Sequence, residues 1–303
     1  MNKISSYVSS LIFSILLVLS LTASIGMLIV DINVTPEKAV DLSRKEDLAS
    51  KCLTQIEKYF REQSNATGVP AEVYTEPLTI GYINKVIEET YIKNVFDNIK
   101  KEEKVDPFPP VNPDLDDSID KFFNDYADKI GYEKDDAFYE KLESAKSNAY
   151  KVIGNNCDVY KAKSLSKHGV VSKVSKLYKL RPVLTFASIA ATVIMLFFII
   201  AVNWKNKKLS LYWIGISSII SGIIGTVPSV YLIVTKYFDS FSIKQPQVFK
   251  AYTGAMYKLT AAFMAVSIAI AVVGIALVVL YAVFCSKDKH SDETAPVIPA
   301  DEE

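Results

Sequence analysis

The sequence predicts an all-α protein with four transmembrane helices and an exported α-helical bundle inserted between spans 1 and 2. Three observations support this fold class: four long uncharged segments, helical spacing of apolar residues elsewhere, and no sustained alternation of period two. Half of the 303 residues are hydrophobic, which excludes a disordered chain, and three cysteines are too few for a disulfide-rich mini-domain.

Each of the four uncharged segments is long enough to cross a bilayer core, which takes about 20 apolar helical residues. They are residues 7–30, 182–203, 209–235 and 259–286. The first segment resembles a secretory signal, but such signals usually have an apolar region of about 7–15 residues. We therefore interpret it as an uncleaved signal anchor, with a cleaved signal as the alternative.

The orientation follows from the signal-like N-terminus and from the three lysines of the loop 204–208, which place both termini in the cytoplasm. Basic residues before the second span favour the opposite orientation, although long segments translocate largely regardless of their charge. We predict a plasma-membrane protein. The parts outside its spans are a cytoplasmic N-terminus 1–6, an exported domain 31–181, a cytoplasmic loop 204–208, an exported loop 236–258 and a disordered cytoplasmic tail 287–303.

The exported domain is predicted to contain four amphipathic helices that bury one another's apolar faces. Thr35-Pro36-Glu37 has the residue types of a helix start, and Glu76-Pro77 is expected to begin the second helix. The third helix, with Leu115 and Ile119, is expected to end at Gly131. Between the second and third helices, four prolines in residues 104–113 predict an extended segment.

Charge is unevenly distributed along a chain whose 34 basic and 34 acidic residues cancel. Residues 31–150 hold 26 acids and 16 bases, a net of −10, whereas residues 151–181 hold one acid and eight bases, a net of +7. The basic stretch either lies on an anionic membrane surface or neutralises the acidic bundle. Its candidate membrane-surface residues are Lys161, Lys163, Lys167, Lys173, Lys176, Lys179 and Arg181.

Two cysteines of the exported domain, Cys52 and Cys157, are candidates for a disulfide, with two buried thiols as the alternative. The acids between Asn112 and Asp120 are dense enough to consider calcium, but they lack an EF-hand pattern and are better explained by the dipole of the third helix. The sequence contains no HExxH, G-x-S-x-G or Walker motif, and we predict no catalytic residues, no metal and no cofactor.

Small residues in the third and fourth spans predict faces on which helices pack closely in lipid. The candidate helix-packing residues are Ser218, Gly222, Gly225, Ala265 and Ala269.

The order of one span, a large domain and three further spans, with Gly68-Val69-Pro70 followed by Pro77-Leu78-Thr79-Ile80, resembles uncharacterised four-span membrane proteins of Gram-positive bacteria with a helical extracellular domain. This resemblance implies no particular activity. The same layout is similar to permease subunits of ABC export systems, in which a cytoplasmic coupling segment joins spans 2 and 3. Here the corresponding loop, 204–208, is too short for such a helix.

We therefore expect a non-enzymatic envelope protein that acts in interaction, sensing or scaffolding through its exported helical domain. Its expected partners are the lipid bilayer and another envelope or membrane protein, and not nucleic acid, since the net charge is zero. The alternative is a permease or accessory subunit of an ABC-type export system. A membrane enzyme is a third hypothesis, for which the sequence offers no catalytic pattern.

Overall fold

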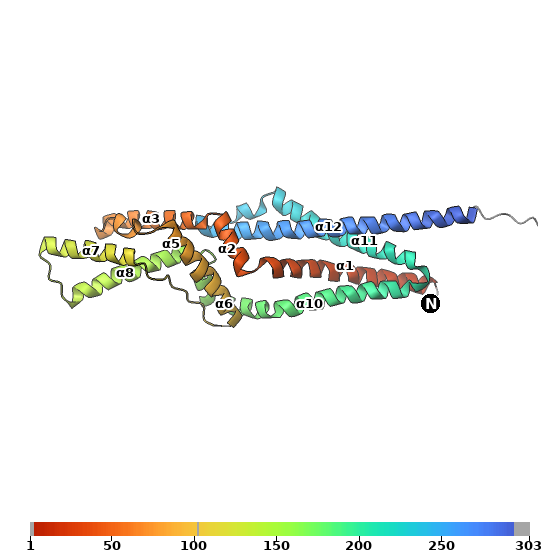
Figure 1. The fold of residues 1–303 in the computed structure, drawn as a ribbon, viewed down its shortest axis with the longest axis horizontal. Helices are drawn as coiled ribbons and strands as arrows, with labels where there is room; N and C mark the ends of the chain where they lie inside the picture. The colour runs from red at the N-terminus through yellow and green to blue at the C-terminus, as the bar shows by residue number, and fades with distance from the viewer. Residues whose placement is uncertain (1–2, 102, 294–303) are drawn as a thin grey trace, which may run out of the picture. The chain divides into compact units, whose positions relative to one another are not determined.

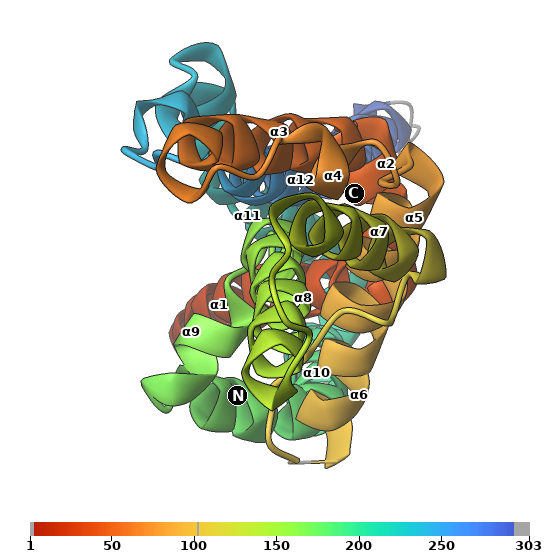
Figure 2. The same cartoon turned by 90° about the vertical axis from the view of Figure 1, so that its left-hand side faces the viewer.

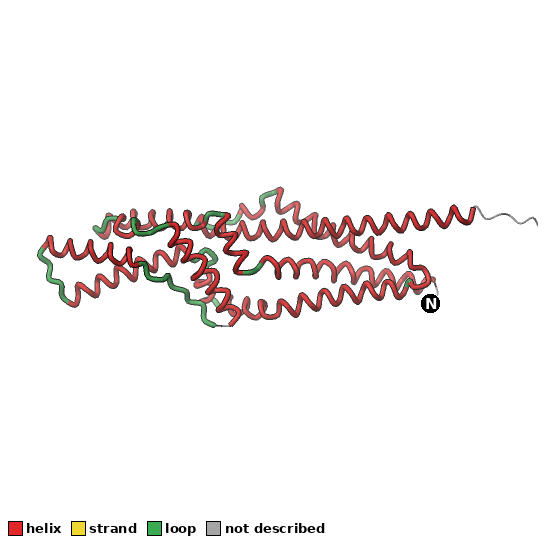
Figure 3. The backbone as a smooth tube through the Cα atoms, viewed as in Figure 1, coloured by secondary structure: helices red, strands yellow, loops and turns green. Residues whose placement is uncertain are grey.

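A computed structural model of the chain describes residues 3–101 and 103–293, and this part contains helices and loops only (Figures 1 and 3). The chain divides into two compact units. We call Met1–Asn33, Arg181–Tyr237 and Lys258–Glu303 the membrane unit, and Val34–Leu180 with Phe238–Tyr257 the head. The prediction of an all-helical chain is confirmed for the described residues.

Four helices are long and apolar enough to cross a membrane, as the sequence predicted. They are α1 (Lys3–Asn33), α10 (Val170–Val202), α11 (Lys207–Val234) and α12 (Pro246–Glu293). All four start before the apolar segments do, and two of them start far earlier: α10 begins at Val170 within the basic stretch, and α12 begins at Pro246 within residues 236–258, the predicted loop. Of the predicted disordered tail, the part up to Glu293 is helical and residues 294–303 lie outside the described part.

The head is built from short and medium helices that follow one another along the chain. They are α2 (Pro36–Lys45), α3 (Leu48–Thr67), α4 (Glu72–Thr75), α5 (Ile80–Lys85), the π-helix η1 (Val86–Lys93), α6 (Asn94–Lys101), α7 (Pro113–Ile130), α8 (Asp136–Cys157) and α9 (Ala162–Lys167). Figure 2 shows α7 next to α4 and α8 beneath α3.

Local capping explains where several head helices begin and end. The Thr35 side chain accepts a hydrogen bond from the Lys38 backbone at the start of α2, and Gly131 ends α7 with a φ of 66°, both as predicted. The second predicted helix begins later than Glu76-Pro77, because Thr79 caps the N-terminus of α5. A left-handed residue, Asp47, separates α2 from α3 where the sequence indicated one continuous helix.

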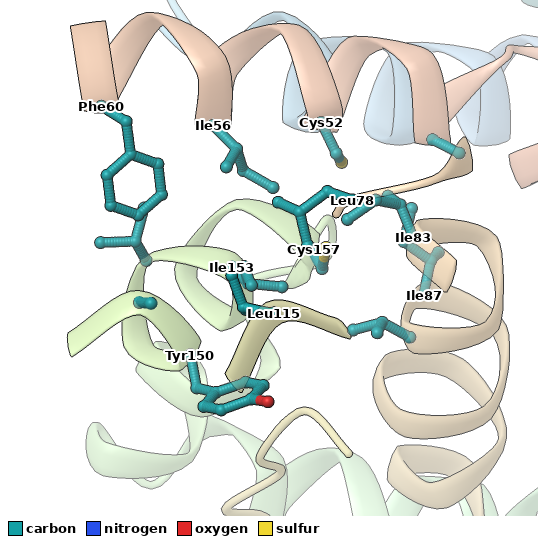
Figure 4. Packing of buried hydrophobic residues seen from close by; sticks show 14 of the residues in the cluster. Cys52, Ile56, Phe60, Leu78, Ile83, Ile87, Leu115, Tyr150, Ile153 and Cys157 are labelled. Carbon is teal, nitrogen blue, oxygen red and sulfur yellow. The ribbon is translucent and has the colours of Figure 1, made fainter. Parts of the chain in front are cut away.

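The head has a single large apolar core to which α3, α5, η1, α7 and α8 all contribute (Figure 4). Its central side chains have almost no exposed surface: Ile56, Ile83, Ile87, Leu115 and Ile153. Burial of each such side chain contributes about 1.5–3 kcal/mol to folding, so the apolar stripes of these helices hold the head together.

The first turns of α12 belong to the head and close its core. Ala251 and the Gln247 side chain are fully buried, and the Tyr252 hydroxyl donates a 2.8 Å hydrogen bond to the backbone oxygen of Tyr160. Part of the segment between the third and fourth spans is therefore a packed element of the head.

In the membrane unit, α11 packs against α12 through glycine. A Cβ atom added to Gly222 would lie 2.6 Å from the Cβ of Ala271, and one added to Gly225 would overlap the hydroxyl of Ser267. The candidate packing residue Ser218 is buried. On α12 the contacting face carries Ser267 and Ala271, whereas the candidate packing residues Ala265 and Ala269 are exposed.

Hydroxyl groups link α1 to its neighbours inside the same unit. The hydroxyls of Ser14 on α1 and Ser217 on α11 lie 2.5 Å apart, and those of Ser24 on α1 and Thr192 on α10 lie 3.0 Å apart. Each pair gives a polar side chain a partner away from water, where an unpartnered hydroxyl is costly.

Substituting Gly222→Leu should destabilise the membrane unit, because the new side chain must displace Ala271 on α12. Overpacking of this kind costs about 1–3 kcal/mol. We expect the free energy of unfolding, measured by detergent titration of the full chain, to fall by this amount. The neighbouring Ile223→Leu is the control, since Ile223 is 52% exposed. Equal stability of the two variants would contradict the glycine contact.

Candidate interaction surfaces of the head

The Pro-rich segment, residues 103–112, runs extended between α6 and α7, as its prolines predicted. Tyrosine hydroxyls hold its backbone in place. Tyr82 on α5 donates a 2.7 Å hydrogen bond to the backbone oxygen of Pro110, and the Tyr150 hydroxyl on α8 accepts a 2.8 Å bond from the backbone N–H of Asn112. These bonds satisfy backbone groups of a segment that is not helical.

Gly154 lets the Pro-rich segment approach α8 closely. A Cβ atom at this position would lie 3.2 Å from Cδ of Pro109 and 2.5 Å from the hydroxyl of Tyr91. Burial raises the pKa of Tyr150 to about 12 and also raises the pKa of Tyr91. Both hydroxyls therefore stay protonated at neutral pH and keep their capacity to donate.

The Tyr150 hydroxyl also contacts Asp116, because it donates a 2.8 Å hydrogen bond to the Asp116 carboxylate. Two of the acids that raised the calcium question, Asp116 and Asp120, thus have partners within the protein. The Asn112 side chain caps α7 by accepting from the Asp114 backbone, and Asp120 forms a 2.7 Å ion pair with Lys146. Among the described residues, no group of three His, Cys, Asp or Glu side chains is arranged to hold a metal ion.

The α7–α8 hairpin, residues 113–143, presents an acidic surface that also carries exposed aromatic rings. The hairpin has 11 acidic and four basic residues, a net charge of −7. Tyr126, Tyr132 and Tyr139 have exposed fractions of 54%, 44% and 51%, and Ile130 is 55% exposed. We call these four side chains and the acids around them the hairpin tip.

The opposite side of the hairpin is fixed in the core. Leu115 and Ile119 of α7 are fully buried, and so, nearly, are Phe138 and Leu142 of α8. Tyr126 and Tyr139 are therefore presented by two helices whose inner faces are anchored, and Tyr132 lies in the loop that joins these helices.

One contact within the hairpin shows what the tyrosine faces can bind. The ammonium group of Lys141 lies over the ring of Tyr132, 5.9 Å from its centroid. A cation at this distance is attracted by the ring's quadrupole. The tip thus holds one cation of its own chain on an aromatic face.

The two cysteines of the head, Cys52 on α3 and Cys157 at the end of α8, are both fully buried in the core (Figure 4). Cys52 Sγ donates to the backbone oxygen of Asn156, and burial raises the pKa of the Cys157 thiol, with the Cys52 thiol adding to that rise. The structure has both as free thiols, and a disulfide between them stays a prediction. Cys285 on α12 is partly exposed.

The basic stretch contains side chains with partners in the protein and side chains that are exposed to solvent. Lys163 forms a 2.8 Å ion pair with Asp106, Lys161 donates to the backbone oxygen of Asn155, and Arg181 in the membrane unit pairs with Asp31 at 2.5 Å. The remaining predicted membrane-surface residues are exposed: Lys167, Lys173, Lys176 and Lys179. The exposed lysines alternate with apolar side chains such as Leu177, which is 62% exposed.

An ion pair in the head between a buried acid and an exposed arginine was not found from the sequence. Glu88 lies on the π-helix with only 8% of its surface exposed, and it accepts two 2.6 Å hydrogen bonds from the guanidinium of Arg44 on α2. Such a two-bond pairing fixes the orientation of both groups. The only sequence signal for this ion pair was an acidic residue next to Ile87 on an apolar stripe. No sequence pattern indicates the π-helix itself.

The comparisons with known proteins add no relative, since no family model, no curated protein and no solved structure matches the chain.

Substituting Tyr150→Phe should destabilise the head, because the backbone N–H of Asn112 would stay buried without a partner. Leaving one such group unsatisfied costs about 1–3 kcal/mol. The free energy of unfolding of the full chain, measured with denaturant, should fall by this amount. Tyr139→Phe on the same helix is the matched control, and its exposed hydroxyl predicts a change within about 0.5 kcal/mol. Equal effects of the two substitutions would refute the assigned role of Tyr150.

Proposed function

We propose that this chain is a multi-pass plasma-membrane protein that displays its head on the outer side and binds a cationic partner in the cell envelope through the hairpin tip. The observation that carries the proposal is the exposure of three tyrosines on a hairpin with a net charge of −7. The protein acts by binding, in interaction, sensing or scaffolding, and the membrane unit anchors it.

The outward orientation rests on the N-terminal sequence and the loop between α10 and α11. The first span resembles a signal anchor, and three lysines lie between the second and third spans, where the positive-inside rule favours the cytoplasm. Both termini then lie in the cytoplasm and the head lies outside.

The exposed tyrosines favour protein recognition over simple solvation. Tyrosine is enriched at interfaces because its ring buries a large area and its hydroxyl keeps a hydrogen bond at the rim. A surface that only contacts water does not favour three half-exposed rings and Ile130 at one end of a hairpin. The tip therefore has the composition of an interface, and the charged residues around it are mostly acidic.

The sign of that charge selects the partner. An acidic surface attracts a lysine- or arginine-rich segment over long range, and charge complementarity raises the association rate as well as excluding acidic partners. The Lys141 ammonium on the Tyr132 ring is an internal example of the same contact. A basic segment of another envelope or membrane protein fits both features.

The exposed lysines of the basic stretch support a second contact, with anionic lipid headgroups. Near a charged bilayer each lysine or arginine contributes about 1 kcal/mol. Lys173, Lys176 and the 62% exposed Leu177 are the side chains best suited to it. This contact would hold the start of α10 at the membrane surface.

The alternative, a permease or accessory subunit of an ABC-type exporter, finds less support. A single short turn, Trp204–Asn206, joins α10 to α11, which already begins at Lys207. This connection leaves no room for a separate coupling helix that could contact an ATPase.

The test of the proposed function is photo-crosslinking in the native envelope. A photoreactive amino acid replacing Tyr132 should give a discrete adduct, whereas the same group replacing the exposed Gln63 on α3 should not. Asp125→Lys combined with Glu133→Lys should abolish the Tyr132 adduct. The matched control, Glu72→Lys combined with Glu76→Lys, reverses two exposed acids outside the hairpin and should leave the adduct intact.

Two results would count against this function: adducts of equal yield from positions 132 and 63, or a Tyr132 adduct that survives charge reversal of the hairpin. A photoreactive group in the turn Trp204–Asn206 that captured a cytosolic ATPase would instead favour the exporter alternative.

A further inference from the structure

We propose that a second surface of the head, a groove between α3, α8 and the residues just before α12, binds a neutral oligosaccharide. The groove has a volume of about 510 Å³ and lies entirely within the head. It shares no residue with the hairpin tip, so the inference goes beyond the proposed function.

Amide side chains are concentrated in this groove. Five of its ten lining residues are asparagine or glutamine, although the whole chain has only 13 asparagines and four glutamines, 17 in 303 residues. The five are Gln55, Asn148, Asn155, Asn156 and Gln245. About one amide in eighteen residues would be expected by composition, so the groove is enriched roughly ninefold.

Amides have the bonding capacity that a sugar needs. Each neutral amide offers two N–H donors and a carbonyl acceptor, and each sugar hydroxyl donates one hydrogen bond and accepts others. Within the described part of the chain, the side chains of Gln55, Asn148, Asn155 and Gln245 make no hydrogen bond to protein. Their polar atoms are therefore open to a ligand.

One wall of the groove is held rigid from behind. Asn156 donates a 2.9 Å hydrogen bond to the backbone oxygen of Val152 and accepts a 3.2 Å bond from Gln247, whose side chain is fully buried. A fixed amide loses little conformational freedom when a ligand binds, which favours affinity.

The charges at the groove are nearly balanced, which argues for a neutral ligand. Lys58 and Glu62 on α3 form an ion pair with a 3.9 Å separation, and Lys151 is the remaining charged side chain of the lining. Recognition of a phosphate or a carboxylate would call for a cluster of cations, preferably arginine.

Tyr59 supplies the apolar surface that a sugar ring requires. Its ring is 36% exposed and is braced from one side by Phe60, with the ring centroids 5.4 Å apart. The C–H face of a pyranose can lie on such a ring while its hydroxyls reach the amides.

A peptide fits this groove less well than a sugar does. Extended peptides are bound by adding a strand to a sheet, and the described part of the head has no strand. Helical and Pro-rich peptides need apolar or aromatic channels, whereas the aliphatic lining residue here is Val152, which is buried.

The experiment is saturation-transfer NMR on the full chain in lipid nanodiscs, without sugar-headed detergent. The probes are chitotetraose, maltotetraose and cellotetraose, with an uncharged Gly-Ala tetrapeptide in parallel. We expect transfer to at least one oligosaccharide and none to the peptide. Asn148→Ala or Gln55→Ala should weaken binding about fivefold, as loss of one hydrogen bond predicts. Gln63→Ala, an exposed amide on α3 outside the groove, should leave it unchanged.

The role of the ring is tested separately. Tyr59→Ala should abolish transfer, whereas Tyr59→Phe, which keeps the ring, should retain it. Each variant must show the melting temperature of the unsubstituted chain. The inference fails if no oligosaccharide receives transfer, if the peptide receives as much, or if the groove variants and Gln63→Ala behave alike. Because the probes are soluble and the chain is purified, this outcome does not depend on the orientation or the hairpin partner in the proposed function.

Discussion

The head is organised around a segment that cannot form a helix. Prolines in residues 103–112 remove backbone donors, and the groups that remain must still find partners where the segment is buried. Tyr82 and Tyr150 supply hydroxyls for this purpose, and Gly154 provides the space in which Pro109 lies. The same Tyr150 hydroxyl reaches Asp116 in the first turn of α7, so this contact also sets where the α7–α8 hairpin begins.

The membrane unit meets a different constraint, because lipid provides no hydrophobic force between helices and no hydrogen bonds to polar groups. Glycine on α11 permits close backbone contact with α12, and hydroxyl pairs such as Ser14 and Ser217 connect α1 to α11. Close packing and hydroxyl pairs thus do among these four apolar helices what apolar burial does in the head.

The sequence predicted those features that depend on local chemistry. Apolar length identified the four spans, Thr35 and Gly131 identified helix ends, and the prolines identified the extended segment. The sequence could not predict features that depend on contacts between residues far apart in the chain. Periodicity could not show that residues 246–257 complete the core of the head, that Glu88 is buried against Arg44, or that Tyr139 is exposed while Tyr150 is not. The amides of the groove, 190 residues apart in the case of Gln55 and Gln245, likewise become neighbours only in the fold.

In the proposed function the head recognises a partner and the spans anchor the protein, which requires the head to lie outside the cell. The native Cys52 and Cys157 are fully buried and unsuited to surface labelling, so the decisive measurement uses introduced cysteines in a Cys285→Ser chain. Asn65→Cys lies on an exposed part of the head and Lys205→Cys on the exposed turn before α11. A membrane-impermeant maleimide should label position 65 in intact cells and position 205 only after permeabilisation. The reverse pattern would place the head in the cytoplasm and contradict the account.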